Sequence, residues 1–342
     1  MRRPLARMQP LRVAYLLEDT GMAGGIRVAV AQADALAARG HELTLITKGE
    51  PLNWRHSHAK WLYVPSFDEV DASDFDFVIG TFWKTLPFVH RVAGTRAVHL
   101  CQGYEGSFTA YRDLKREIED AYRLPLPKIT VSPHLVQICR QFTDDATYIG
   151  QIVDDLFFRQ PQLRDRERPR VLLVGPMQAD FKGIDVGYDA VRHARAHGAQ
   201  FDLVRVSQWP ATDDEPATLA DEFHVGLNSA DMARLIATCD IYLGPSRHQE
   251  GFGLPAAESM AAGLATVLSA IPSFLSFDGA HDYTLFAPEN DGVAMGDALL
   301  QLLDDHSLRR RVALRGREVV EQFRSHHTGL RLERYFLDRR TR

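Results

Sequence analysis

One short segment of the chain, residues 245–270, combines a glycine-rich loop with two acidic side chains. Its sequence is PSRHQEGFGLPAAESMAAGLATVLSA. Pro255 stands where a first helical residue is expected, because proline lacks only an N–H that is unpaired at that position anyway. The N–H groups of the loop and the positive end of the helix dipole then face one spot and attract an anion. We therefore expect a phosphate or diphosphate site built by Gly251, Phe252, Gly253 and Leu254.

The two glutamates of this segment have a different expected role. Glu250 precedes the helix and Glu258 is expected in its first turn. Both carboxylates would repel a diphosphate, so they are better explained as acceptors for the hydroxyl groups of a ribose and a sugar. Because Gly251 and Gly253 lack a Cβ, a ligand can approach the backbone closely. The alternative is a helix with an acidic first turn after an ordinary glycine-rich loop, which needs no ligand.

The composition narrows the class of protein. The chain has 342 residues, of which 45% are hydrophobic, and this is enough for two cores. Its formal net charge of −5 gives no general attraction to nucleic acid, so we expect no nucleic-acid partner. The cysteines are too far apart for a zinc or disulfide motif and are expected to be buried thiols of a reducing compartment: Cys101, Cys139 and Cys239.

The hydropathy pattern predicts a cytoplasmic protein, because no run of 18 uncharged apolar residues occurs. The pattern is compatible with peripheral attachment to a membrane through basic side chains, and it predicts no oligomeric state. Short apolar runs alternate with longer amphipathic segments in both halves, as in a parallel sheet covered by helices. The strand-like runs are residues 13–17, 42–47, 75–80, 170–175, 201–207 and 240–246.

This alternation predicts an α/β protein with two Rossmann-like, doubly wound domains that face each other across a cleft. We expect the N-terminal domain at residues 1–158 and the C-terminal domain at 170–322. The polar, proline-containing segment 159–169 is expected to be the linker. Residues 323–342 are expected to form a helix that packs back on the N-terminal domain.

The motifs of the C-terminal half resemble those of family-4 glycosyltransferases, which are retaining enzymes of the GT-B fold. The spacing of Glu250 and Glu258 around GFGLP resembles the E-x7-E signature of that family. The resemblance covers most of the C-terminal half and returns in the first forty residues. Its other motifs are Leu243-Gly244-Pro245-Ser246, Ala262-Gly263, Val174-Gly175, Lys182-Gly183, Gly24-Gly25 and Arg39-Gly40-His41-Glu42.

The resemblance implies a metal-independent transfer from a nucleotide-diphosphate sugar, which is a co-substrate, with no further cofactor. It implies that Glu258 holds the ribose hydroxyls, that Glu250 holds the donor sugar and that Lys182 faces the diphosphate. A fixed ammonium there would stabilise the charge that builds up on the leaving diphosphate. The alternative for Lys182 is an exposed lysine in a turn before Gly183.

The chain departs from the family pattern at two positions. Pro176 stands where the family usually has an arginine that contacts the diphosphate. We expect Arg247 to replace it, with Arg205 as the second choice. Ser207, on the same strand as Arg205, is expected to contact the donor. Gln102 stands at a strand end where members often have a histidine, and an amide cannot act as a general base, so its role would be positional. His99 on the same strand is expected to be a core residue.

The remaining expected contacts come from two N-terminal loops. The loop before the first helix is expected to place Gly25 at the donor and Gly24 and Arg27 at the acceptor. The stretch QGYEGSF is expected to place Tyr104 and Glu105 on the acceptor side. Together with residues 121–132, it resembles a branch of the family linked to rhamnosyl transfer into surface polysaccharides. This ranks dTDP donors slightly ahead of UDP and GDP donors, with a glycan, lipid-linked or small-molecule acceptor.

Two other patterns are expected to be structural. Asp74-Phe75-Asp76 matches a D-x-D metal motif, but it opens a strand instead of following one. His56, His58 and the pair His326-His327 have no third ligand at a suitable spacing. Two rival functions remain open at this point: a nucleotide-sugar epimerase on the same fold, and a non-catalytic subunit that binds nucleotide sugars.

Overall fold

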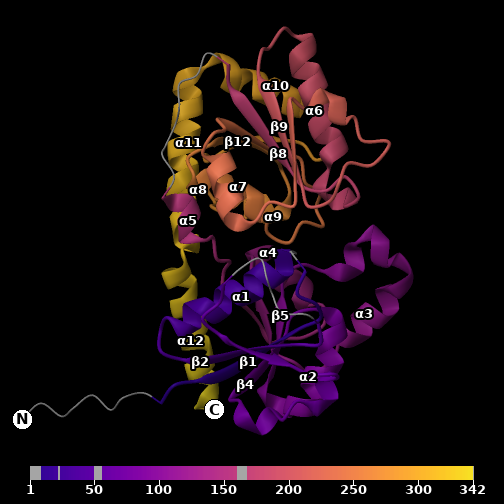
Figure 1. The fold of residues 1–342 in the computed structure, drawn as a ribbon, viewed down its shortest axis with the longest axis vertical. Coiled ribbons are helices and arrows are strands. Elements are labelled where there is room, and N and C mark those ends of the chain that lie inside the picture. The colour runs from indigo at the N-terminus through magenta and orange to yellow at the C-terminus, as the bar shows by residue number, and fades with distance from the viewer. Residues whose placement is uncertain (1–8, 22–23, 50–55, 160–167, 342) are drawn as a thin grey trace, which may run out of the picture.

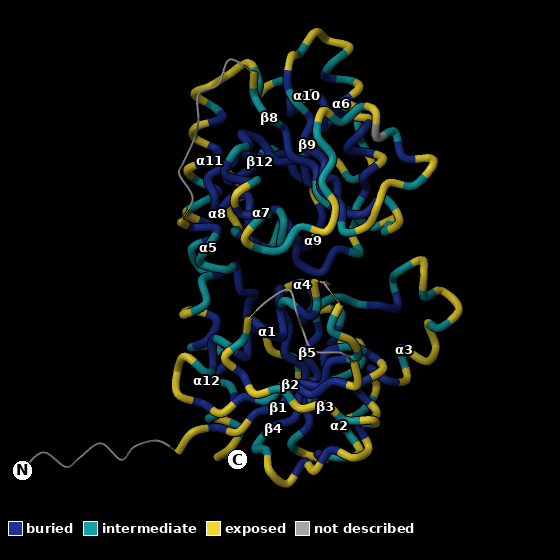
Figure 2. Tube along the Cα trace, in the orientation of Figure 1, coloured by how far each residue is buried: buried dark blue, intermediate teal, exposed yellow. Residues whose placement is uncertain are grey.

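The computed structural model describes residues 9–21, 24–49, 56–159 and 168–341. The chain forms two α/β halves that lie one above the other in Figure 1. Helices α11 and α12, in yellow, run along one side of both halves. The expected linker, 159–169, falls for the most part outside the described residues. Figure 2 shows that the strands of each half are buried and that exposed residues lie mainly at the outer loops and helices.

The N-terminal half contains a parallel sheet of seven strands in the order β3-β2-β1-β4-β5-β6-β7. The strand order reverses between β1 and β4, and ligands of such sheets bind at the carboxyl ends near this point. The strands are β1 (Arg12–Leu17), β2 (Glu42–Thr47), β3 (Lys60–Tyr63), β4 (Phe77–Gly80), β5 (Ala97–Cys101), β6 (Lys128–Thr130) and β7 (Ala146–Tyr148).

The C-terminal half repeats this arrangement with six parallel strands in the order β10-β9-β8-β11-β12-β13. Its central strands are buried along nearly their whole length, as expected for a sheet that is covered on both faces. The strands are β8 (Arg170–Val174), β9 (Asp202–Ser207), β10 (Glu222–Val225), β11 (Ile241–Gly244), β12 (Ala265–Ser269) and β13 (Leu285–Ala287).

The helices connect successive parallel strands and cover both sheets. Those of the N-terminal half are α1 (Gly24–Ala37), α2 (Leu86–Ala93), α3 (Lys115–Tyr122), α4 (Pro133–Cys139) and α5 (Asp155–Phe158). Those that follow are α6 (Ile184–Ala196), α7 (Ser229–Ile236), α8 (Leu254–Ala261), α9 (Pro272–Leu275), α10 (Gly292–Asp304), α11 (His306–Val320) and α12 (Ser325–Arg340). Each helix of the described chain is too short or too polar to cross a membrane.

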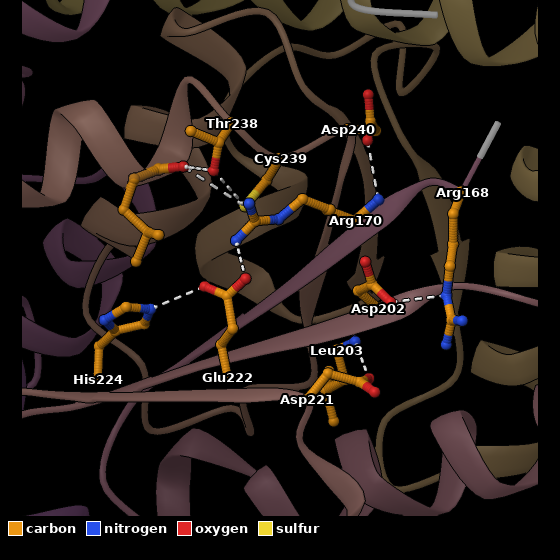
Figure 3. A network of polar contacts seen from close by, with 11 residues as sticks. Arg168, Arg170, Asp202, Leu203, Asp221, Glu222, His224, Thr238, Cys239 and Asp240 are labelled. Carbon is orange, nitrogen blue, oxygen red and sulfur yellow. Dashed lines mark hydrogen bonds and ion pairs between the residues drawn. The ribbon is translucent and has the colours of Figure 1, made fainter. Parts of the chain in front are cut away.

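A polar network ties together the amino ends of the C-terminal strands (Figure 3). Arg170, at the start of β8, pairs with Glu222 at the start of β10 at 2.7 Å. Its backbone N–H donates to the Asp240 carboxylate just before β11, at 2.8 Å. Asp202, the first residue of β9, pairs with Arg168 at 2.6 Å. The charged groups at this edge are occupied with one another, and the carboxyl ends of the strands face the other half.

Helix α12 returns to the N-terminal half and packs against α1. Thr328 Oγ1 donates to the carbonyl oxygen of Gln151 at 2.7 Å, and Arg331 Nε donates to that of Ile149 at 2.7 Å. Because α1 lies between the sheet and α12, nine of its 14 residues are buried, and its small and apolar side chains suit this position. The packing of α12 therefore supports the carboxyl-terminal part of α1, where Gly329 lies against Ala35.

Candidate active site

A cavity of about 930 Å³ lies between the two halves, at the carboxyl ends of both sheets. Residues that follow β1, β4 and β5 line it from one side, and residues that follow β8, β9 and β11 line it from the other. The structure brings together most of the residues singled out by the sequence: Gly24, Gly25, Arg27, Gln102, Glu105, Lys182, Ser207, Glu250, Gly251, Phe252, Gly253, Leu254 and Glu258.

The glycines of the loop before α8 serve packing within the protein. A Cβ at Gly251 would lie 2.0 Å from the carbonyl oxygen of Gln102, which belongs to the opposite half. Gly253 has a φ of +89°, and a Cβ there would lie 2.2 Å from the ring of Phe274. These two glycines therefore allow a close approach of protein atoms to the loop backbone, and the approach of a ligand to the same backbone stays a prediction.

Glu258 lies one residue further from the start of α8 than the sequence indicated. The helix begins at Leu254, so Glu258 is its fifth residue and belongs to the second turn. Its carboxylate is almost fully buried and forms an ion pair with Arg27 of α1, across the cleft. Arg27 was expected on the acceptor side, but it contacts the carboxylate that was expected to hold the donor ribose.

A second ion pair joins Lys182 to Glu250. Lys182 Nζ lies 2.6 Å from a carboxylate oxygen of Glu250, and Ser246 Oγ donates to the same carboxylate at 3.2 Å. Gly183, directly after the lysine, has a φ of +60°, and a Cβ there would lie 2.0 Å from the carbonyl oxygen of Pro245. The turn that carries Lys182 is thus pressed against the loop that carries Glu250, which fixes the pair at the cavity wall.

Gln102, just after β5, presents an amide to the cavity. Its Nε2 donates to the carbonyl oxygen of Thr81 at 3.2 Å. Its buried Oε1 has no hydrogen-bond partner among the described residues. The amide also lies against the backbone of Gly25, where a Cβ would be 3.5 Å away. The free oxygen can accept a hydrogen bond from a ligand hydroxyl, which is compatible with a positional role.

Glu105 is a buried acid at the cavity wall. Burial raises the pKa of its carboxyl group to about 7, although the Tyr122 hydroxyl donates to it and favours the charged form. His99 lies beneath, edge to face with the Tyr122 ring at 4.8 Å. Burial and the nearby Lys128 lower the pKa of His99 well below its usual range, so His99 is a neutral core residue, as the sequence predicted.

The sequence interpretation missed a contact between Ser132, the residue before α4, and the glycine-rich loop before α8. Ser132 Oγ donates to the carbonyl oxygen of Gly251 at 2.8 Å and lies 2.9 Å from His134 Nδ1. Burial lowers the pKa of His134 to about 4, although the charge of Glu250 opposes this shift. The imidazole is therefore neutral at pH 7. Both residues follow the carboxyl end of β6, and residues at the carboxyl ends of parallel strands often line a ligand site. This position could have identified them from the sequence.

Two aromatic groups at the cavity were also missed. Trp209, two residues after β9, lines the cavity with 46% of its surface exposed. Phe108 and Phe181, from opposite halves, stack at a centroid distance of 4.9 Å. An exposed tryptophan after a strand end is a detectable signal, whereas the pairing of two distant phenylalanines is not.

Arg247 does not line the main cavity. Its Nη2 pairs with Asp185 at 2.7 Å, and its Nε donates to Asn290 Oδ1 at 2.7 Å. It borders a neighbouring hollow of about 570 Å³. In this structure its guanidinium is therefore bound to protein groups outside the place where the sequence put it.

Arg205 and Tyr104 also lie outside the cavity lining. Arg205 is fully buried within the C-terminal half, and its Nε donates to Glu215 at 3.0 Å. The Tyr104 hydroxyl lies 3.3 Å from the carboxylate of Glu119, while its ring packs against Tyr122. Side chains of a strand such as that of Arg205 alternate between the two faces of the sheet, and the sequence alone does not show which face borders the cavity.

The D-x-D pattern lies at the far end of its strand. Asp74 closes a short turn and Asp76 precedes β4, where its carboxylate accepts from the Arg12 N–H at 2.8 Å. This is the amino end of the sheet, opposite the cavity. Within the described ranges, no three His, Cys, Asp or Glu side chains are grouped so that they could hold a metal ion.

Comparison with known proteins points to one family. Residues 168–305 match the family described as "Glycosyl transferases group 1". Phosphatidyl-myo-inositol mannosyltransferase of Mycolicibacterium smegmatis is 28% identical over 186 residues, which are 52% of this chain and 48% of the relative. The uncharacterized glycosyltransferase YqgM of Bacillus subtilis is 34% identical over 110 residues, 32% of this chain and 30% of the relative. The chain thus matches about half, or less, of the length of these curated relatives.

Solved structures share the whole fold. Sucrose-phosphate synthase from Thermosynechococcus elongatus superimposes with a TM-score of 0.80 at 18% identity, over 97% of this chain and 99% of that one. HepE of Anabaena, in complex with UDP-glucose, superimposes with a TM-score of 0.79 at 13% identity, over 96% of this chain and 100% of that one. WaaG, a glycosyltransferase involved in lipopolysaccharide biosynthesis, superimposes with a TM-score of 0.70 at 15% identity, over 95% of this chain and 99% of that one. The predicted GT-B type fold is confirmed.

Proposed function

We propose that this protein is a glycosyltransferase that moves a sugar from a nucleoside diphosphate to an acceptor hydroxyl. One observation carries the proposal: the half that matches the glycosyl transferase family supplies Lys182, Glu250, Glu258 and the loop 251–254 to a single cavity at the sheet ends. This combination offers a cation and backbone amides for phosphates, and carboxylates for hydroxyls.

Each group has a task in the proposed reaction. The loop amides and Lys182 would hold the diphosphate and stabilise its charge as it leaves. Glu258 would accept hydrogen bonds from the ribose hydroxyls and Glu250 from the donor sugar. The free Oε1 of Gln102 would accept one from a hydroxyl in the cavity. Closure of the halves would exclude water, which competes with the acceptor.

We further propose that the transfer retains the configuration of the donor sugar, as the family-4 resemblance implies. The acceptor oxygen would attack the anomeric carbon from the face that the diphosphate leaves, and the acceptor proton would pass to the departing diphosphate oxygen. We favour this route over a covalent intermediate because the two carboxylates nearest the predicted diphosphate, Glu250 and Glu258, are both assigned to hydroxyl groups of the donor. The anomeric configuration of the product, measured by nuclear magnetic resonance, tests it.

The donor and acceptor are proposed by class. We place dTDP sugars slightly ahead of UDP and GDP sugars, while a neighbouring structure, HepE, contains UDP-glucose. The acceptor is a glycan, a lipid-linked acceptor or a small molecule. We propose a reaction without a metal cofactor, and transfer in the presence of EDTA should then equal transfer in its absence. A requirement for Mg²⁺ or Mn²⁺ would contradict this part of the proposal.

The first test is a panel of nucleoside diphosphates in a thermal-shift assay, because a ligand that binds only the folded state raises the melting temperature. The purified chain is then incubated with the matching sugar nucleotides, with and without acceptors. Transfer or slow donor hydrolysis supports the proposal. Conversion of the donor to an epimer without acceptor would assign an epimerase instead. Binding without hydrolysis or transfer across many acceptors would assign a non-catalytic binding subunit.

A further inference from the structure

The charged side chains around the cavity are unevenly balanced. Among the described residues that line it, the cations are Arg27 and Lys182, and the acids are Glu18, Asp19, Glu105, Asp180, Glu250 and Glu258. A diphosphate adds further negative charge, and like charges in a cleft with low-dielectric walls repel each other strongly. A nucleoside diphosphate in this cavity would therefore gain much from contact with both cations.

Arg27 has the geometry for such a contact. Its Nη2 pairs with the buried carboxylate of Glu258, and its own side chain is 21% exposed toward the cavity. Its Nε is buried and has no hydrogen-bond partner among the described residues. A guanidinium binds phosphate oxygens through two parallel N–H groups. The unused Nε–H of Arg27 could therefore donate to a phosphate oxygen of a ligand in the cavity.

We propose that Arg27 is the second cation of the diphosphate site. This inference rests on the proposed function. When the ribose hydroxyls of a donor take the oxygens of Glu258, the Arg27 guanidinium would shift from that carboxylate to the diphosphate, which Lys182 also contacts. The two cations come from opposite halves, since Arg27 belongs to α1 and Lys182 follows β8. Diphosphate binding would therefore hold the cleft closed.

A plain structural role for Arg27 makes different predictions. If Arg27 only joined the halves, its loss would weaken the binding of every cavity ligand to the same extent. If it only competed with ribose for Glu258, its loss would tighten every nucleoside-containing ligand. A role at the diphosphate is distinguished by the ratio of diphosphate to nucleoside affinity, because the nucleoside lacks the group that Arg27 would contact.

The experiment compares Arg27→Gln and Arg27→Lys with the wild-type chain. Dissociation constants are measured by calorimetry for UDP, dTDP and GDP and for uridine, thymidine and guanosine. Arg91→Gln is the matched control, because that arginine is more than half exposed and pairs with Asp68 on the surface. Arg27→Gln should weaken the diphosphate about 10- to 100-fold while the nucleoside binds as before or more tightly. Arg27→Lys, which keeps the charge, should lie between.

The outcomes separate the two proposals. Equal weakening of nucleoside and diphosphate, or tightening of both, overturns the role of Arg27 and leaves the transferase proposal standing. Unchanged diphosphate binding by Arg27→Gln also overturns the role of Arg27 and leaves the transferase proposal standing. If the wild-type chain binds none of the three diphosphates, the proposed function fails and this inference fails with it. Circular dichroism and the melting temperature show whether each variant is folded.

Discussion

Gly251 and Gln102 meet across the cleft without any side-chain atom of residue 251 between them. A Cβ at position 251 would lie 2.0 Å from the carbonyl oxygen of Gln102, and Ser132 Oγ donates to the Gly251 carbonyl at 2.8 Å. The loop expected to bind phosphates is thus also a contact between the halves. A change in this backbone should affect the site and the domain contact together.

Gly251→Ala should force the halves apart at the catalytic cleft. Because a misplacement of about 1 Å can reduce a rate about 100-fold, transfer should fall by roughly that factor while each half stays folded. Turnover and circular dichroism are measured together. Gly279→Ala is the control, because a Cβ there meets nothing within 4 Å. Wild-type turnover in Gly251→Ala would show that this close contact is not needed for activity.

Lys182→Ala should mainly slow turnover. The ammonium, 2.6 Å from Glu250, would interact more strongly with the leaving diphosphate than with the intact donor. The loss of one preorganised group that stabilises developing charge typically reduces kcat about 100- to 1000-fold. Steady-state kinetics should show this loss with a KM near the wild-type value, and Lys182→Arg should recover part of it. A raised KM with an unchanged kcat would argue against this role.

Glu258→Ala should weaken nucleotide binding instead. A buried carboxylate that accepts from hydroxyl groups contributes about 1.5–3 kcal/mol, which corresponds to roughly a 10- to 100-fold change in affinity. The loss should appear for the nucleoside as well as for the diphosphate, in contrast to Arg27→Gln. Calorimetry with both ligands measures it. Equal affinities in the variant and the wild-type chain would show that Glu258 does not bind the ribose hydroxyls.

Glu105 should make stability depend on pH. Burial raises its pKa from 4.5 to about 7 in the folded state, so between these values the folded chain keeps a proton that the unfolded chain has lost. Stability should therefore decrease as the pH rises through this window, by up to about 3 kcal/mol. Glu105→Gln keeps an acceptor for the Tyr122 hydroxyl but cannot ionise, so the stability of this variant should change less with pH. Melting curves between pH 4.5 and 8 in both chains check it, and identical slopes would contradict it.

Arg247→Gln should have little effect on catalysis, although the sequence favoured this residue as a diphosphate contact. Its guanidinium is taken by Asp185 and Asn290 outside the cavity. Because Arg247 does not line the cavity, it should make no contact with the transition state, and kcat/KM should change by less than about threefold. Kinetics side by side with Arg27→Gln provide the comparison. A large loss in Arg247→Gln and none in Arg27→Gln would reverse the assignment.

Most of the fold followed from local patterns. Apolar runs such as 13–17 and 170–175 are strands near the centres of their sheets, because a continuous apolar run is stable only where both faces are covered. The loop 250–254 could also be predicted from a local pattern, because its glycines and Pro255 determine the backbone conformation of only a few neighbouring residues. The start of α8 at Leu254 was not evident, so Glu258 was placed one residue too close to the start of the helix.

The sequence by itself determined two α/β halves and the loop that opens α8, because these depend on hydropathy period and on backbone chemistry within short segments. Their GT-B type arrangement was implied by the resemblance to family-4 glycosyltransferases. Only the tertiary structure decided which charged side chains reach the cleft. Arg27 and Glu258 are 231 residues apart, and their contact exists only because the halves dock. Arg247 is three residues from Glu250, yet its partners in the folded chain hold it outside the cavity.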